Sequence, residues 1–126
     1  MFGTVLQVAL GGAVGASLRY LAGVAILRNF GSHPFPLGVI AVNILGSFIM
    51  GALVVFLGQK GLTHWNALLA TGMLGGFTTF SSFSLESWRL METGQTELAA
   101  LYIGLSVAVS ILALIAGVHL MRTVLA

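Results

Sequence analysis

Charged residues are so sparse in this chain that they leave four apolar segments, each long enough to cross a lipid bilayer. Only 6% of the 126 residues are charged, while 58% are hydrophobic. A helix needs about 20 apolar residues to span the hydrocarbon core, and the segments cover residues 4–27, 37–58, 65–89 and 97–121. Because only helices and closed barrels satisfy their backbone in lipid, we predict an all-α membrane protein with four transmembrane helices, in a single domain over residues 1–126.

The same composition argues against several classes of function. The chain has no cysteine, which excludes disulfides, thiol catalysis and cysteine-ligated metals. Its five Lys and Arg residues are spread along the chain, so no nucleic-acid partner is predicted. The three histidines lie near segment ends, without metal-ligand spacing or a carboxylate and nucleophile beside them, and no enzymatic activity is expected. No basic region precedes the first segment, which is therefore predicted to be a retained span rather than a cleaved signal.

The connections between segments contain ordinary boundary signals. Trp65 and Trp88 are 23 positions apart, roughly 35 Å along a helix, which suits an aromatic belt at each membrane interface. Thr96 is predicted to be the N-cap of the last helix, with Glu97 favourable in its first turn. The connection over residues 28–36 and the turn over residues 59–64 carry no motif that indicates a function.

The third segment contains a stretch that is a poor plain helix. Residues 75–83 read GGFTTFSSF, with two adjacent glycines, four hydroxyls and three aromatic rings in a region without charge. Glycine favours a break, and the β-branched Thr78 and Thr79 are mildly helix-averse. Unwound backbone is tolerated at membrane depth only where protein buries it or a cavity hydrates it. We therefore predict that the spanning helix is broken within this stretch, at Gly75–Thr78, at a site that binds something small and charged.

The charges at the segment ends do not choose an orientation. With four spans, Lys60 and Arg122 lie on one side of the membrane and Arg28 and Arg89 on the other, so the positive-inside rule counts two against two. One explanation is a weakly biased protein oriented by the insertion machinery. The other is a chain that inserts both ways and pairs as an antiparallel dual-topology homodimer, which would supply the two-fold symmetry that many transporters obtain from inverted repeats.

Small residues recur at four-residue spacing in every span, and in lipid this spacing lets helix backbones approach closely. The pattern predicts helix packing but cannot separate folding from dimerisation. The pairs are Gly11 with Gly15, Ser47 with Gly51, Gly72 with Gly76, and Ser106 with Ser110.

Few polar residues occur inside the spans, and each needs a partner or a wet cavity. Asn43 is either interhelical glue or part of a cavity, and Arg19 either extends to the interface or lines an aqueous vestibule. Two polar stripes follow single helix faces, and together they could line a narrow hydrated path. The stripes are Tyr102, Ser106 and Ser110 on the fourth segment, and Thr79, Ser82 and Glu86 on the third.

Phe80 and Phe83 share a face if the helix resumes after the break, because they are three residues apart. The usual role of phenylalanine in a membrane protein is to fill space between helices. The alternative uses the ring quadrupole, whose positive edge can face an anion.

Three motifs resemble the CrcB/Fluc family of bacterial fluoride channels, and the resemblance extends over the whole chain. They are residues 11–20 (GGAVGASLRY), 42–48 (VNILGSF) and 75–83 (GGFTTFSSF). The resemblance implies passive fluoride export through two pores in an antiparallel homodimer within lipid, as a multi-pass protein of the bacterial inner membrane. It also implies a central structural sodium ion held by main-chain oxygens, which by motif would come from Gly75 and Thr78 of both subunits.

The resemblance also assigns roles to residues of the pore. It implies that Phe80 and Phe83 turn their ring edges to fluoride, that Asn43 donates to it and that Arg19 lies in the vestibule. It matches Tyr102, Ser106 and Ser110 more loosely. Two other functions remain as alternatives: an exporter driven by proton exchange, for which Glu86 is the only titratable candidate, and a non-conducting assembly subunit.

Overall fold

All 126 residues are described by the computed structural model, and every element in it is helical. Four segments are long and apolar enough to cross a membrane: Phe2–Phe30, Leu37–Gln59, Thr63–Glu92 and Thr96–Leu125. Each contains one of the predicted segments and extends it by a few residues. The prediction of an all-α membrane protein with four spans, the third of them bent, is therefore confirmed.

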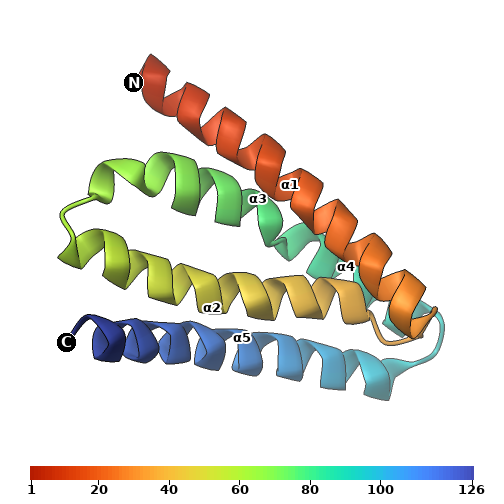
Figure 1. Cartoon of the computed structure of the whole chain (residues 1–126). Helices are drawn as coiled ribbons and strands as arrows, with labels where there is room; N and C mark the ends of the chain where they lie inside the picture. Colours follow the sequence, from red (N-terminus) through yellow and green to blue (C-terminus); the bar gives the residue numbers. More distant parts are fainter.

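Three of the spans are continuous helices and the third is composite (Figure 1). The continuous ones are α1 (Phe2–Phe30), α2 (Leu37–Gln59) and α5 (Thr96–Leu125). The third span begins with a short 3-10 turn, η1 (Thr63–Trp65), followed by a π-helical stretch, η2 (Ala67–Leu74), and the short helix α3 (Gly75–Phe77). After the break it resumes as α4 (Phe80–Glu92).

The helices pack in two pairs whose contacts depend on glycine. Gly51 of α2 and Gly117 of α5 lie so close to the facing backbone that a Cβ on either would collide with a carbonyl of the partner helix. Gly15 of α1 lies equally close to the third span, and a Cβ on Gly76 would lie 2.8 Å from the Gly12 carbonyl oxygen of α1. The predicted close packing of small residues is thus confirmed between α1 and the third span, and for Gly51 between α2 and α5.

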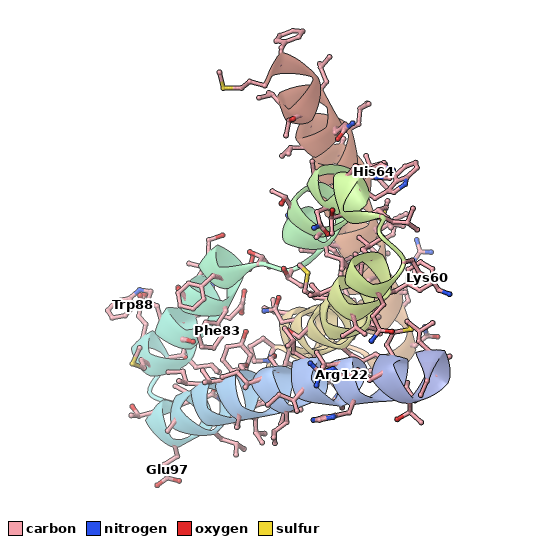
Figure 2. The ribbon with its side chains drawn as sticks, turned by 90° about the vertical axis from the view of Figure 1, so that its left-hand side faces the viewer. Lys60, His64, Phe83, Trp88, Glu97 and Arg122 are labelled. Atoms are coloured by element: carbon pink, nitrogen blue, oxygen red, sulfur yellow. The ribbon has the colours of Figure 1, made fainter.

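Charged side chains gather at the two ends of the bundle. Lys60 follows α2, and Arg122 lies in the last turn of α5, at the end where both termini are found (Figures 1 and 2). Arg28 and Arg89 lie in the last turns of α1 and α4, at the opposite end. The fold therefore keeps the even distribution of charge that the sequence predicts.

The chain by itself buries few side chains. Only 16 of 126 residues are buried, and the one large side chain that is fully enclosed is Tyr102, at 0% exposure. Tyr102 belongs to a small cluster with Ile40, Leu90 and Ala99. The rest of the apolar surface is open, as expected for helices whose neighbours are lipid or a second subunit.

One helix boundary differs from the prediction. Thr96 is the first residue of α5 rather than its N-cap, and Gln95 precedes it without a side-chain cap. The reason is that the Ala99 N–H donates to the Gln95 carbonyl at 2.9 Å, which begins the helix one residue earlier. Glu97 does lie in the first turn, where its charge favours the helix dipole.

Candidate functional site

The third span is broken at Thr78 and Thr79, inside the predicted stretch and at the carboxyl end of Gly75–Thr78. Both threonines are extended, with φ −87° and ψ 155° for Thr78 and φ −151° and ψ 122° for Thr79. The glycines, which were expected to favour the break, stay helical: Gly75 has φ −61° and ψ −37°, and Gly76 lies within α3. Glycine is required at position 76 by the close approach of α1.

Asn43 of α2 holds the unwound strand in place. Its Nδ2 donates to the Thr79 carbonyl at 3.0 Å, and the Thr79 N–H donates to its Oδ1 at 2.8 Å. The side-chain amide thus replaces both helical partners of Thr79, as expected for an Asn that bonds helices together. An amide nitrogen carries two N–H groups, and only one of those on Asn43 is used within the chain.

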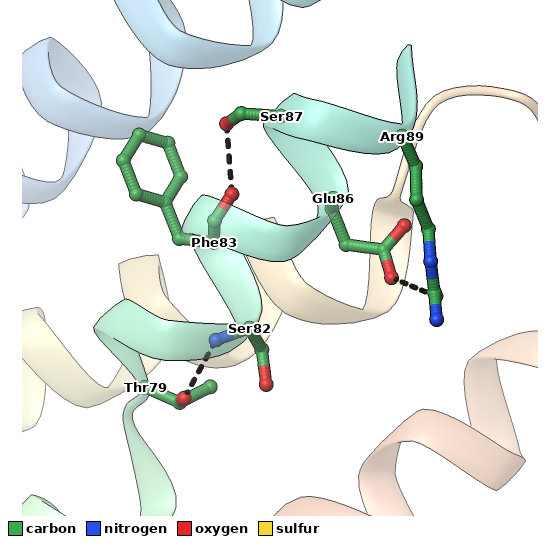
Figure 3. Close-up of polar contacts among 6 residues, drawn as sticks. All are labelled: Thr79, Ser82, Phe83, Glu86, Ser87 and Arg89. Atoms are coloured by element: carbon green, nitrogen blue, oxygen red, sulfur yellow. Dashed lines mark hydrogen bonds and ion pairs between the residues drawn. The ribbon is translucent and has the colours of Figure 1, made fainter. Parts of the chain in front are cut away.

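The break separates several main-chain carbonyls from their usual helical partners, among them those of Gly75 and Thr78. In a continuous helix the Thr79 N–H would bond to the Gly75 carbonyl, and the Ser82 N–H to that of Thr78. Here the Thr79 N–H donates to Asn43, and the Ser82 N–H donates to the Thr79 hydroxyl at 3.2 Å (Figure 3). Thr79 is therefore the side-chain N-cap of α4, and the Gly75 and Thr78 oxygens are left to other partners.

Arg19 also contacts the broken span. Its Nε donates to the Gly76 carbonyl at 3.1 Å, and the side chain is half-buried. The bond anchors Arg19 beside the break, so its guanidinium does not simply extend to the interface. Arg19 lines a hollow of about 300 Å³ together with Thr79 and Ser82.

A groove of about 320 Å³ runs along the break, between α2, the start of α4 and α5. It brings together six of the predicted pore residues, and no charged side chain lines it. The predicted residues are Asn43, Thr79, Phe80, Phe83, Ser106 and Ser110. Thr79 is shared with the hollow beside Arg19, so the two cavities meet at the break.

Three aromatic rings form a row beside this groove. The centroids of Phe80 and Phe83 are 5.4 Å apart, and those of Phe83 and Tyr102 are also 5.4 Å apart. Figure 3 shows the Phe83 ring on the side of α4 that faces α5, away from Glu86. Phe80 is 77% exposed, so most of its ring is left uncovered within the chain.

The polar stripe on α5 lies against the same region. The hydroxyl oxygens of Tyr102, Ser106 and Ser110 are buried and have no hydrogen-bond partner in the chain. A buried polar atom without a partner is costly, and native proteins normally satisfy it with water or a ligand. Three of them in succession along one helix face indicate a path for something that accepts hydrogen bonds.

Sequence reasoning missed three residues of the groove as site residues: Ser47, Val107 and Ile111. Helical spacing could have revealed Ser47, because it lies one turn after Asn43. Val107 and Ile111 are apolar residues on an apolar helix, and no sequence signal marks them. Glu86 lies outside the groove and pairs with Arg89 at 2.9 Å. No group of three or more His, Cys, Asp or Glu side chains could hold a metal.

Comparison with known proteins places the chain in a family. Residues 6–118 match the family described as CrcB-like protein, Camphor Resistance (CrcB). A protein of Ruegeria sp. named Fluoride-specific ion channel FluC is 60% identical over 122 residues, which cover 97% of each chain. A protein of the same name from Cereibacter sphaeroides is 55% identical over 97% of each chain. A third, from Agrobacterium fabrum, is 48% identical over 94% of this chain and 95% of its own.

These relatives are ion channels by name and not enzymes, which agrees with the expectation that this chain is not an enzyme. The match covers nearly all of the chain at high identity, includes the three motifs that carry the resemblance, and extends over all four spans. The chain therefore belongs to the CrcB family.

Proposed function

We propose that this protein is a fluoride-selective channel that lets fluoride leave the bacterial cytoplasm passively, across the inner membrane. The observation that carries the proposal is the uncharged groove, where unpartnered hydroxyls lie close to aromatic rings. The names of the relatives support fluoride as the ion.

The chemistry of the groove suits a small anion that must leave its water. Fluoride at bilayer depth needs hydrogen-bond donors to replace hydration, and the free Asn43 N–H and the serine hydroxyls supply them. The ring edges of Phe80 and Phe83 add weak positive potential in an apolar wall. A lysine or arginine in the groove would hold the ion too tightly, since conduction needs weak, multiple sites.

The groove is incomplete in one chain, which supports a dimer. Phe80 is 77% exposed on its rim, and only 16 residues of the chain are buried. An antiparallel homodimer would cover the open side, would repeat the groove by symmetry and would thus form two pores. The balanced end charges, Lys60 and Arg122 against Arg28 and Arg89, favour insertion in both orientations.

A labelling experiment tests the antiparallel arrangement. A single cysteine added after Ala126 in this cysteine-free chain should react with impermeant reagent from both sides of the membrane in comparable amounts. Labelling from one side alone would reject the dual topology. Fluoride flux would remain a separate question.

We further propose a structural sodium ion at the break, held by the Gly75 and Thr78 carbonyls of both subunits. The donors fit this ion, because hard cations prefer oxygen ligands and unwound backbone in transporters supplies carbonyls to sodium. Both carbonyls have lost their helical N–H partners, and they lie at the carboxyl end of a half-helix, where the dipole is negative. When bound, the ion would hold the two breaks together without entering the anion path.

The alternatives receive less support from the geometry. A proton-driven exporter needs a titratable residue in the substrate cavity, whereas Glu86 lies outside the groove and pairs with Arg89. A non-conducting assembly subunit would not explain why the hydroxyls of Tyr102, Ser106 and Ser110 are buried without a partner in the chain.

Reconstitution into liposomes tests the proposed function. Liposomes loaded with potassium fluoride should release fluoride when a potassium ionophore balances the charge, with no proton gradient applied. Matched liposomes loaded with potassium chloride should retain chloride. Fluoride release that requires a proton gradient, or equal chloride release, would contradict the proposal.

A further inference from the structure

We propose that Phe35, in the connection between α1 and α2, is a positioning residue for the anion path. Its ring supports Tyr102, and Tyr102 in turn supports the ring of Phe83 at the groove. The inference rests on the function proposed above, because it gives Phe35 a part in the same path. No motif in the sequence marks this residue, and the connection that contains it was without an assigned role.

Four aromatic rings form a continuous row from the α1–α2 connection to the groove. Phe35 meets Tyr102 edge to face, with centroids 5.5 Å apart and planes at 88°. Tyr102 lies 5.4 Å from Phe83 with planes at 40°, and Phe83 lies 5.4 Å from Phe80 with planes at 59°. Edge-to-face and offset pairs within this range attract beyond their buried area. The row therefore connects the α1–α2 connection to the helix break.

Tyr102 depends on its neighbours for its orientation. The side chain is 0% exposed, and its hydroxyl has no hydrogen-bond partner in the chain. A buried tyrosine is usually anchored by its O–H group; within the chain, the aromatic contacts of Tyr102 are the ones that fix the plane of its ring. Phe83 is its aromatic contact toward the groove, and Phe35 is its aromatic contact toward the connection.

The backbone presents Phe35 rigidly. The residue lies between Pro34 and Pro36, so one φ angle on each side is fixed and the Phe35 backbone is biased toward an extended conformation. Pro36 has φ −77° and ψ 79°, and the Leu37 N–H donates to the Phe35 carbonyl at 2.9 Å. These are the features of an inverse γ-turn. A connection of this kind can hold a ring in one place.

Phe35 also separates Tyr102 from open space. Its ring is partly buried against the Tyr102 cluster and lines a hollow of about 260 Å³ at the connection. A smaller side chain at position 35 would leave Tyr102 room to tilt toward that hollow. The Phe83 ring would then lose its fixed support, and its edge would no longer face the path at a constant angle.

Substitution of Phe35 tests the inference in the liposome assay. Phe35→Leu should lower fluoride flux roughly two- to tenfold, the range that the coupling of one aromatic pair implies, while the dimer still assembles. Phe35→Tyr keeps the ring and should restore flux close to that of the parent. Phe30→Leu is the matched control, because Phe30 is 64% exposed near the same connection and forms no pair with Tyr102.

A double-mutant cycle separates positioning from general destabilisation. If Phe35 acts through Tyr102, then Phe35→Leu should cause no further loss of flux in a Tyr102→Leu chain. Losses that multiply, or a Phe35→Tyr chain that stays impaired, would overturn the inference. If Phe35→Leu does not give a dimer, Phe35→Met takes its place under the same criteria.

The outcomes distinguish the two proposals. If the parent conducts fluoride and Phe35→Leu conducts equally well, only the role of Phe35 is rejected. If the parent releases no fluoride, the proposed function is rejected, and the role of Phe35 in it is rejected as well.

Discussion

The third span and α5 both cross the membrane beside the groove, but the helix of the third span is broken and α5 is continuous. Each span is 30 residues long and contributes polar residues to the groove, but the mean hydropathy of an 18-residue window is 1.2 in the third span and 2.5 in α5. The third span gives up its helix at Thr78 and Thr79, whereas α5 is unbroken from Thr96 to Leu125. A span can thus expose either main-chain or side-chain polar groups at membrane depth.

The broken span contributes main-chain atoms, and it needs outside support to do so. The Asn43 amide forms hydrogen bonds with both the N–H and the carbonyl of Thr79, and Arg19 donates a hydrogen bond to the Gly76 carbonyl. In contrast, α5 keeps its backbone paired and presents three buried hydroxyls. We therefore expect changes on the third span and at its supports to have larger effects than changes on the stripe of α5.

The largest effect is expected at the rings that follow the break. Phe80→Ile and Phe83→Ile keep bulk and hydrophobicity but remove the quadrupole. Contact of a desolvated cation with a ring is worth about 2 kcal/mol, and a similar value for an anion at the ring edge predicts a loss of roughly thirtyfold in fluoride flux. Liposome flux measures the loss, with Phe30→Ile as the control. If both variants conduct fluoride as fast as the parent, the two rings only fill space in the protein and do not interact with the anion.

A smaller but still large effect is expected at the support of the break. Asn43→Ala removes two hydrogen bonds from Thr79, each worth about 1 kcal/mol, with a further penalty for unpaired backbone groups. We expect lower thermal stability of the purified protein, together with reduced flux. Asn43→Asp keeps the acceptor for the Thr79 N–H but adds negative charge beside the groove. It should therefore preserve more stability than alanine, yet block fluoride. If Asn43→Ala is as stable as the parent, the extended conformation of Thr78 and Thr79 does not depend on the hydrogen bonds from Asn43.

The smallest effect is expected on α5. Ser106→Ala and Ser110→Ala each remove one hydroxyl that has no partner in the chain, so stability should hold or rise while flux falls by a few-fold, as expected for one hydrogen bond of about 1 kcal/mol. Ser17→Ala is a matched control, because the Ser17 hydroxyl already donates to the Ala13 carbonyl at 2.7 Å on an exposed face. If Ser106→Ala or Ser110→Ala lowers fluoride flux as much as Phe83→Ile does, changes on α5 are no milder than changes on the third span, and the expected order of effects is wrong.

The sequence predicted the spans well because their cause is local. Scarcity of charge over about 20 residues is enough to define a membrane helix. The break was also predicted, and it lies at the helix-averse threonines of the predicted stretch, whereas the glycines that were expected to favour it stay helical. Gly76 is instead required by the close approach of α1, and a contact between distant segments is invisible to a local pattern.

The same limit applies to the site. Spacing along single helices grouped Ser106 with Ser110 and Phe80 with Phe83, and the groove contains all four residues. Spacing could not reveal that Asn43 pairs with Thr79, 36 positions away, or that Arg19 bonds to Gly76, 57 positions away. A role for Phe35 could not be predicted for the same reason, because only the fold places its ring against Tyr102.

If the groove between the break and α5 is the proposed path, the protein should conduct fluoride and no other common anion. The reversal potential of the protein in a planar bilayer, with a tenfold gradient of fluoride and an opposing gradient of chloride, measures this selectivity. We expect reversal at the fluoride equilibrium potential, about 59 mV for a tenfold gradient of a monovalent ion, and no shift when the pH of one side changes. A reversal potential that follows chloride, or that moves with pH, would contradict the proposal.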